Sequence, residues 1–337
     1  MTRPLKNQMA IVFGLCVLGL ICGPCAGKKS RGREINTVNA PGILWSKPTD
    51  LASRNLFWGP GGEEHQPHGP FLFVKEDMEG TSPKFTVVDK DGVKWKVKLG
   101  LEARPETAAS RLVWSVGYYT NEDYHMDDLK VQDLPTLQRG QKLVGPDGVI
   151  HNVRLKREEK GDKKTGIWRW NDNPWTGTRE LNGLRVLMAL IDNWDLKDEN
   201  NAVYEKDGQR IYMVSDLGAS FGTPGRSWPK EKAKDTLEED SRAKFIRAYA
   251  GDTVDLATPA RPRWVYLVDP KEYFSRVHLE SLGKKIPRDD ARWMGQLLAN
   301  LSPNQIRDAL RASGYAPDEV ERFAQVLQTR IAQLTDL

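Results

Sequence analysis

The chain has 337 residues, of which 39% are hydrophobic and 28% are charged, so it can bury one two-lobed domain or two small ones. A formal charge of +4 gives no global indication of nucleic-acid binding, and the five histidines show neither metal-ligand spacing nor a zinc signature. All three cysteines lie within the first 25 residues, which excludes a disulfide in the rest of the chain.

The N-terminal segment has the pattern of a secretory leader. Arg3 and Lys6 precede an apolar run from Met9 to Cys22, and small residues follow at 25–27. This run is short for spanning a bilayer, so we expect a signal peptide over residues 1–27, with an N-terminal membrane anchor as the alternative. The sequence therefore predicts export to the cell envelope or periplasm, with membrane contact only through this segment if it is not cleaved.

Residues 28–69 are expected to form an N-terminal extension ahead of a β-rich region. The pattern of apolar and β-branched residues predicts three strands, at residues 71–74, 84–88 and 93–99. Residues 89–92, Asp-Lys-Asp-Gly, are typical of a tight hairpin between the last two strands. The turn between the first two contains Gly80 and Ser82. We interpret it as a candidate loop over nucleotide phosphates, with a plain surface turn as the alternative.

The third strand places three lysines on one face. Lys94, Lys96 and Lys98 alternate with apolar residues, because successive side chains of a strand point to opposite faces. A solvated position suits Lys94. One of the other two is expected to bind the α- and β-phosphates of a nucleotide, and Lys98 is preferred over Lys96 because it ends the strand just before a turn into a helix.

An amphipathic helix is predicted after this strand. Pro105 suits its first turn, apolar residues recur at helical spacing, and Gly117 suits its end. Glu106 in the first turn is the expected carboxylate partner of the strand lysine, and Glu102 is the alternative. Either pairing would fix the lysine next to a bound nucleotide.

The region between the two halves of the chain is expected to connect two lobes. A hairpin at residues 143–150 leads into a strand that continues to Lys156. The aromatic segment at 167–175 is interpreted as packing rather than as a substrate platform. Thr178 suits the N-cap of a helix that runs to Ile191 and whose apolar face suits a buried position.

The segment from Asp195 to Asp216 carries the residue types of a phosphoryl-transfer site. Asn200 lies five residues after Asp195, as in the kinase pattern H-R-D-L-x-x-x-N, and a predicted hairpin then delivers Asp216 to a strand end. Phosphoryl transfer needs a carboxylate near the attacking hydroxyl, a cation on the γ-phosphate and oxygen ligands for Mg²⁺. We therefore expect Asp195 and Lys197 to be catalytic, and Asn200 and Asp216 to bind the metal.

The rest of the chain is predicted to be mainly helical. Residues 223–229 contain two prolines and are expected to be irregular, and residues 230–250 are expected to be helical and largely exposed. Residues 259–270 form a proline-rich connection. Amphipathic patterns predict three further helices, at residues 288–301, 303–313 and from about 317 to 334.

Several of these segments resemble the atypical branch of the protein-kinase-like superfamily, the HipA-like and phosphatidylinositol-kinase-like enzymes. They also closely resemble uncharacterised bacterial envelope proteins of that type. The segments are KWKVKLG with PETAASRLVWSVGY, then GTRELNGLRVLMALIDNWDLKDENN, then VSDLGASFG. The resemblance implies an α+β, two-lobed protein-kinase-like fold with a small β-rich N-lobe at residues 70–156 and a mainly helical C-lobe at residues 157–337.

The same resemblance implies an ATP-dependent enzyme that moves phosphate from Mg-ATP to a hydroxyl on a protein or a small molecule. Lys98 would bind the phosphates, Asp195 would orient or deprotonate the acceptor, and Asn200 and Asp216 would hold Mg²⁺. Asn193-Trp194 replaces the His-Arg of the pattern, and the chain has no multi-glycine loop and no Ala-Pro-Glu segment. These departures argue against an ordinary Ser/Thr protein kinase regulated through an activation loop.

Alternative functions remain open. A catalytically inactive pseudokinase that binds a nucleotide or a partner would suit an exported protein, because ATP is scarce outside the bacterial cytoplasm. Related folds transfer AMP instead of phosphate. Residues 218–222 also match the G-x-S-x-G elbow of serine hydrolases, with Ser220 as nucleophile, although the prolines that follow forbid the helix that this elbow needs. The sequence leaves the acceptor and the oligomeric state open.

Overall fold

A computed structural model describes residues 36–158, 161, 163–222, 237–258 and 270–337, all within one compact unit of the chain, Ile35–Leu337. The predicted leader at 1–27, the irregular segment at 223–229 and the proline-rich connection up to residue 269 lie outside the described residues. Within the described ranges, every helix is too short or too polar to cross a membrane.

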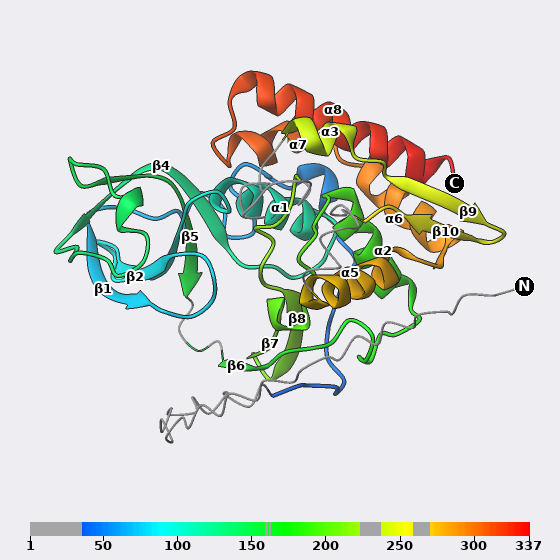
Figure 1. The fold of residues 1–337 in the computed structure, drawn as a ribbon, viewed down its shortest axis with the longest axis horizontal. Coiled ribbons are helices and arrows are strands. Elements are labelled where there is room, and N and C mark those ends of the chain that lie inside the picture. Colours follow the sequence, from blue (N-terminus) through cyan, green and yellow to red (C-terminus); the bar gives the residue numbers. More distant parts are fainter. Residues whose placement is uncertain (1–35, 159–160, 162, 223–236, 259–269) are drawn as a thin grey trace, which may run out of the picture. The chain divides into compact units, whose positions relative to one another are not determined.

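The fold is α+β, as predicted, with a β-rich part before residue 159 and a more helical part after residue 178 (Figure 1). The strands are β1 Phe71–Asp77, β2 Lys84–Val88, β3 Lys94–Leu99, β4 Asp123–Gln132, β5 Val149–Glu158, β6 Lys163–Gly166, β7 Asn201–Lys206, β8 Gln209–Val214, β9 Ile246–Ala250, β10 Thr253–Leu256 and β11 Ile286–Pro287. The helices are α1 Ala103–Ser115, α2 Arg179–Leu190, α3 Leu237–Arg242, α5 Pro270–Gly283, α6 Arg288–Ala299, α7 Pro303–Arg311 and α8 Pro317–Thr335.

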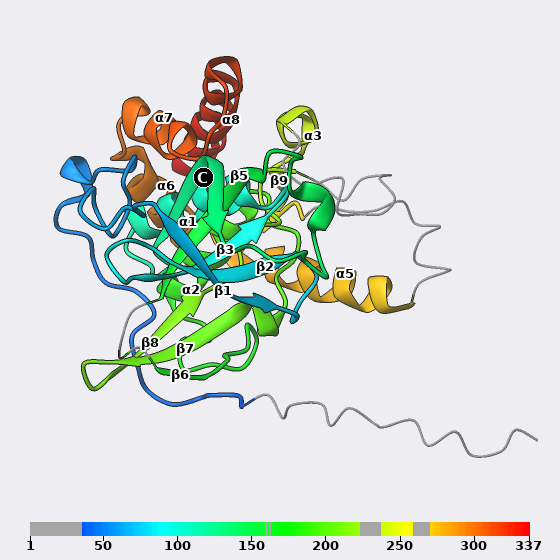
Figure 2. The same ribbon diagram turned by 90° about the vertical axis from the view of Figure 1, so that its left-hand side faces the viewer.

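Five strands close a small barrel in the order β1-β2-β3-β5-β4, which faces the viewer in Figure 2. Alternation along β3 puts Trp95 and Val97 into the barrel core, where both are fully buried. Asp89 fixes the predicted hairpin between β2 and β3, because its carboxylate accepts hydrogen bonds from the backbone N–H of Asp91 and of Val93 and from the Trp95 indole. Strand β4, which closes the barrel, was not predicted from the sequence.

Helix α1 joins the barrel to the helical part. It packs against β4 and β5 on one side and against α7 on the other. Nearly all of its residues are buried, including the charged Glu106 and Arg111. Helix α2 begins where predicted, with the Thr178 side chain accepting a hydrogen bond from the Leu181 N–H, and it contacts α5, α6 and α8.

The part of the chain after residue 158 contains more strand than predicted. Strands β6, β7 and β8 form one three-stranded sheet, and β11, β10 and β9 form another. The prediction of a helix over residues 230–250 is wrong within its described portion, because only α3 is helical there and residues 246–250 form β9. Gly251, with a φ of 60°, forms the turn from β9 into β10, and its Gly-Asp pair is a hairpin signal that outweighs the helical pattern before it.

Candidate functional site

Lys98, at the end of β3, is the centre of the candidate site. The residue is 4% exposed, although it carries a charge. Its Nζ lies 2.7 Å from Glu106 Oε2 and 2.9 Å from Glu102 Oε2. The same atom lies 3.2 Å from Asp216 Oδ1, which is 118 residues away in the sequence. A buried ammonium group is stable only with such partners, so these contacts hold the lysine in one place.

The two glutamates come from the start of α1. Glu102 is the N-cap residue and Glu106 lies in the first turn, so the spacing of four residues places both on one face of the helix. The sequence left Glu102 and Glu106 as alternatives for the partner of the lysine, and the structure places both of them on Lys98. The N-terminal end of α1 carries a partial positive charge from the helix dipole, and this charge stabilises the two carboxylates.

Asp216 reaches this cluster from the residues that follow β8. Its Oδ1 also accepts a hydrogen bond from the Gly218 N–H at 3.3 Å. A Cβ atom on Gly218 would lie 2.7 Å from the Cβ of Glu102, so only glycine allows the backbone after Asp216 to pass this close to α1. The side chain of Asp216 is 44% exposed, which leaves it accessible to a ligand.

The electrostatics of the cluster favour full ionisation of Lys98 and Asp216. Burial lowers the pKa of Lys98, but Asp216, Glu106 and Glu102 outweigh burial and raise that pKa above its ordinary value. Burial raises the pKa of Asp216, but the Lys98 ammonium outweighs it, and the net pKa of Asp216 is lowered. A charged lysine and an ionised aspartate are the states that phosphate and metal binding require.

Arg154 and Asp123 form a second layer behind Glu106, and neither was identified from the sequence. The guanidinium of Arg154 on β5 donates to Glu106 Oε1 at 2.8 Å, and its Nε lies 3.5 Å from Asp123 Oδ1. Both residues are buried. Burial raises the pKa of Glu106, and Arg154 and Lys98 oppose this rise. The signal available in the sequence was a cation between the apolar residues Val153 and Leu155 in a predicted strand.

The loop from Asp195 to Asn200 forms a more exposed part of the site. Lys197 Nζ lies 2.7 Å from Asp195 Oδ1, and the two side chains are 49% and 26% exposed. Burial lowers the pKa of Lys197, but Asp195 outweighs it and the net pKa is raised. The Asp195 N–H donates to Asn193 Oδ1 at 3.0 Å, and His278 Nε2 on α5 lies 3.1 Å from the Leu196 carbonyl oxygen. These contacts fix the loop backbone on both sides of the Asp195 carboxylate.

Asn200 connects this loop to Asp216. The Asn200 carbonyl oxygen accepts hydrogen bonds from the Ser215 N–H at 2.9 Å and from the Asp216 N–H at 3.2 Å. The Asn200 side-chain amide donates to the Asp195 carbonyl oxygen at 2.6 Å and lies 3.4 Å from Asp195 Oδ2. The structure therefore brings Asp195, Asn200 and Asp216 together, as the sequence pattern predicted.

The carboxylates around Lys98 suit a divalent cation. One oxygen from each of Glu102, Glu106 and Asp216 lies within 4.8 Å of the others. Carboxylate oxygens are the ligands that Mg²⁺ and Mn²⁺ prefer, but all three of these carboxylates also contact the Lys98 ammonium. Asp216, whose side chain is 44% exposed, is therefore the carboxylate that is open to the metal that the sequence assigns to Asn200 and Asp216.

Lys96 and the turn between β1 and β2 lie outside the Lys98 cluster. Lys96 Nζ lies 3.2 Å from Asp77 Oδ2, and the side chain is 30% exposed. Gly80 has a φ of 73°, and its carbonyl oxygen accepts a hydrogen bond from Arg139 Nη2 at 2.8 Å. Ser82 is half-buried in the same turn. Arg139 thus holds the turn in one conformation, and phosphate contacts by Gly80 and Ser82 remain a prediction.

Lys84, at the start of β2, is a cation that the sequence reasoning missed. Its Nζ lies 3.9 Å from Asp77 Oδ2 and 3.3 Å from the position that a Cβ on Gly80 would take. Burial lowers the pKa of Lys84, the Asp77 charge opposes this, and the group also interacts with Lys98 and Asp216. Its place in the register was informative, because Lys84 is directly opposite Lys98 in the β2–β3 pair.

The serine-hydrolase alternative does not fit the structure. Ser220 is fully buried, so an ester or amide substrate cannot reach its hydroxyl. No helix starts at residues 221–222, the last described positions of this segment, and Phe221 there has a φ of 56°. An elbow nucleophile needs an exposed hydroxyl at the start of a helix. We therefore discard Ser220 as a nucleophile.

Comparison with solved structures finds kinases. The chain is similar to the Helicobacter pylori proinflammatory kinase CtkA, with a TM-score of 0.41 and 10% sequence identity over 80% of this chain and 95% of that chain. It is also similar to the Golgi casein kinase, with a TM-score of 0.31 and 11% identity over 80% of this chain and 73% of that chain. A second structure of the Golgi casein kinase, with Mn/ADP bound, gives 0.36 and 9% over 80% and 72%.

No family model and no curated protein matches this chain. The TM-scores of the kinase neighbours lie below 0.5. The function proposed below therefore rests on the element order and on the site geometry described above. The narrower resemblance to HipA-like and phosphatidylinositol-kinase-like enzymes remains a prediction.

Proposed function

We propose that this chain is a kinase-like phosphotransferase that moves the γ-phosphate of Mg-ATP to a hydroxyl acceptor. One observation carries the proposal: Lys98 Nζ lies 3.2 Å from Asp216 Oδ1 although the two residues are 118 positions apart. At a kinase nucleotide site, a phosphate-binding lysine with its glutamate partner and a metal-binding aspartate line one cleft, and the Lys98–Asp216 contact brings these residue types together. Ordinary surface ion pairs seldom bury a lysine to 4% exposure.

Each side chain has a distinct role in the proposed reaction. Lys98 binds the nucleotide phosphates, with Glu106 holding the lysine in position. Asp216 and Asn200 would hold Mg²⁺, which would neutralise the charge that develops on the phosphates. Lys197 lies beside Asp195 and would offset charge on the γ-phosphate.

Asp195 is the proposed base for the acceptor. The acceptor oxygen forms a bond to the γ-phosphorus while the bond from phosphorus to the β–γ bridging oxygen breaks. ADP leaves with that electron pair, and Asp195 accepts the hydroxyl proton. Asn193 and Asn200 fix its backbone, and Lys197 Nζ, 2.7 Å from Oδ1, restrains its carboxylate.

The test is an assay of the full chain with ATP labelled at the α- or the γ-phosphate. We expect Mg²⁺-dependent release or transfer of the γ-label, reduced about 10²- to 10⁴-fold by Asp195→Asn with ATP binding retained. Glu199→Gln, in the same loop but with an exposed side chain, is the matched control and should keep the activity. Transfer of the α-label would indicate AMP transfer, and Mg²⁺-dependent binding without any turnover would identify a pseudokinase.

Export to the cell envelope remains part of this proposal and raises the question of the ATP source. Assaying the protein in periplasmic and cytoplasmic fractions of its host would locate it directly. A cytoplasmic location with an uncleaved N-terminus would exclude export and would remove that difficulty for an ATP-dependent enzyme.

A further inference from the structure

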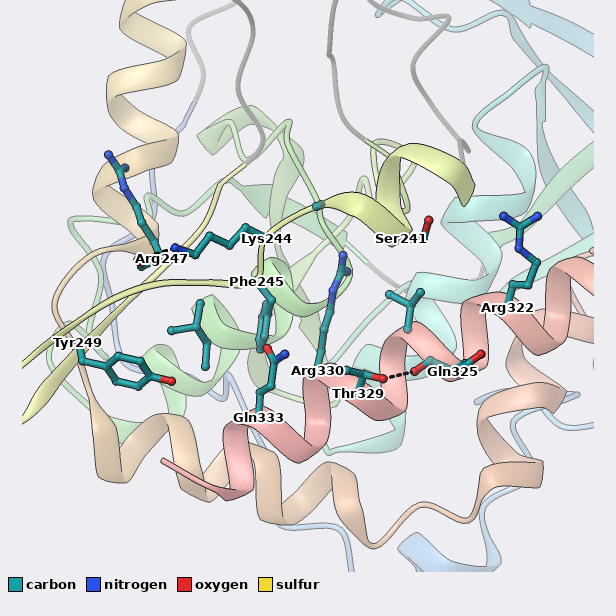
Figure 3. A pocket seen from close by; sticks show the side chains of 13 residues that line it. Ser241, Lys244, Phe245, Arg247, Tyr249, Arg322, Gln325, Thr329, Arg330 and Gln333 are labelled. Carbon is teal, nitrogen blue, oxygen red and sulfur yellow. Dashed lines mark hydrogen bonds between the residues drawn. The ribbon is translucent and has the colours of Figure 1, made fainter.

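A groove separate from the Lys98 cluster runs between β9 and α8. It has a volume of about 750 Å³ and is lined by residues 241–249 on one side and by residues 322–333 on the other (Figure 3). Tyr249 and Phe245 lie on the β9 side, and Gln325 and Gln333 lie on α8. The groove is large enough for a peptide of several residues rather than for a single ion.

The lining of the groove is entirely basic or neutral. None of the thirteen lining residues, all in the described part of the chain, is acidic, although the whole chain is nearly balanced with 50 basic and 46 acidic residues. Arg330 is buried and paired with Asp240 at 3.0 Å, so its charge is already offset. Lys244 and Arg322 therefore supply the positive charge together with Arg247, whose own charge is partly offset by Glu280 Oε1 at 3.9 Å, and an anionic occupant is favoured.

The wall formed by β9 is the edge of a sheet. Among the residues that the structure describes, the strand order β11-β10-β9 leaves one side of β9 without a partner strand. Residues 247–250 are exposed, and Tyr249 is 62% exposed. The pairing with β10 shifts by one residue at Arg247, whose carbonyl oxygen instead accepts a hydrogen bond from Lys244 Nζ at 3.1 Å. An unpaired edge with free backbone groups is a template for another strand.

We propose that this groove binds an extended, acidic segment of a partner protein, which adds a strand beside β9 with α8 as the opposite wall. Acidic side chains on one face of the segment would meet Arg247 and Arg322, and apolar side chains on the other face would pack on Phe245, Ile246 and Val326. A second copy of β9 is disfavoured as the occupant, because its one charged residue, Arg247, is basic like the charged residues of the groove.

One side chain that lines the groove also contacts the backbone that precedes the loop from Asp195 to Asn200. Arg330 lines the groove and donates a hydrogen bond to the carbonyl oxygen of Leu190, the last residue of α2, at 2.6 Å. Asp195 follows five residues later. Docking in the groove thus occurs next to a side chain that is bonded to the end of α2, and the binding itself does not depend on phosphoryl transfer.

Binding is tested by fluorescence anisotropy of the full chain with a labelled peptide of alternating Glu and Val. We expect saturable binding, weakened at least about tenfold by Arg247→Glu and by Arg322→Glu, because each substitution places an acid opposite an acid. Lys90→Glu, an exposed lysine on the β2–β3 hairpin, reverses the same charge outside the groove and should leave the affinity unchanged. Unfolding midpoints of all three variants verify that they fold.

A second probe separates strand addition from charge attraction alone. The same peptide with N-methyl groups on alternate residues keeps its charge but cannot pair with β9, and it should lose binding. The proposal would be overturned if the N-methylated peptide bound as tightly as the unmodified peptide. It would also be overturned if inorganic polyphosphate displaced the labelled peptide as effectively as unlabelled peptide does, because either result would show a general polyanion site. An absence of binding, or equal effects of the Lys90 and Arg322 substitutions, would overturn it as well. None of these outcomes depends on whether the chain transfers phosphate.

Discussion

The Lys98 cluster and the loop from Asp195 to Asn200 hold their charges in opposite ways. In the cluster, the side chains of Lys98 and Glu106 are 5% and 1% exposed, and Lys98 reaches a partner 118 residues away. In the loop, Lys197 and Asp195 are 49% and 26% exposed and lie two residues apart. The cluster is therefore part of the folded core, whereas the loop is a surface feature with a fixed backbone.

This contrast separates stability from catalysis. Removing one charge from a buried, paired set leaves its partners uncompensated in a medium of low dielectric constant, which destabilises the fold. Removing a half-exposed charge leaves a partner that water can solvate, which changes stability little. Substitutions in the cluster should thus affect folding and ligand binding together, and substitutions of Asp195 and Lys197 in the loop should affect turnover alone.

Arg154→Met is expected to have the largest effect on stability. It leaves the carboxylates of Glu106 and Asp123 buried without their shared cation, and we expect a loss of about 3–5 kcal/mol in the free energy of unfolding in urea. Arg311→Met, which breaks a partly exposed pair with Asp308, is the control and should cost less than about 1 kcal/mol. Equal losses for the two variants would mean that the buried cluster is no more important to the fold than a surface pair.

His125 on β4 also has a buried side chain, but burial favours its neutral form, although Asp127 Oδ1 lies 3.6 Å from its Nδ1. Burial lowers the pKa of His125 to about 4, against 6.5 for an ordinary histidine. Between these values the unfolded chain binds a proton that the folded chain does not, so stability falls as pH drops from 6.5 to 4. A difference of this size corresponds to about 3 kcal/mol over that window.

The measurement compares wild type with His125→Asn in urea unfolding at pH 7 and at pH 4.5. The variant has no imidazole to titrate, so its stability should fall less between the two pH values than that of wild type. Only the difference in pH dependence matters, since the substitution also changes packing against Gly314. Parallel pH dependences for the two proteins would show that the fold does not lower the pKa of His125.

Lys84→Met tests whether the cluster extends to β2. Lys84 faces the space beside Gly80 and interacts electrostatically with Asp216, so its loss should raise the KM for ATP about tenfold with a smaller change in kcat. Because burial lowers the pKa of Lys84, this lysine loses its charge at a lower pH than an ordinary lysine does. The difference in KM between wild type and Lys84→Met should therefore shrink as the pH rises through that pKa. Lys96→Met, on the neighbouring strand and paired with Asp77, is the matched control. A larger effect of Lys96 would restore the alternative that the sequence left open.

Local signals in the sequence were sufficient for the loop. The spacing from Asp195 to Asn200, the hairpin before Asp216 and the cap at Thr178 each depend on residues within a few positions of one another. The structure contains the strands, the turn and the helix that these signals predict. Backbone hydrogen bonds from Ser215 and Asp216 to Asn200 then join the two positions that are proposed to bind the metal.

The buried cluster depends on contacts between distant segments, and so less of it could be predicted. Lys96 and Lys98 are identical residues on one face of β3, and only the positions of Asp77 and α1 distinguish them. Arg154 and Asp123 meet because β5 pairs with β3 and β4, a register that no local pattern encodes. The strands β4 and β9 were missed for a similar reason, because each is stabilised by its neighbours in a sheet rather than by its own residues.

Lys98 and Asp216 are proposed to act together on one metal-bound nucleotide. Isothermal titration of the full chain with ATP, with and without Mg²⁺, tests this proposal most directly in wild type and Asp216→Asn. We predict that Mg²⁺ strengthens ATP binding at least about tenfold in wild type and has no effect in the variant. Equal affinities with and without Mg²⁺ in wild type, or an unchanged Mg²⁺ dependence in Asp216→Asn, would contradict the account.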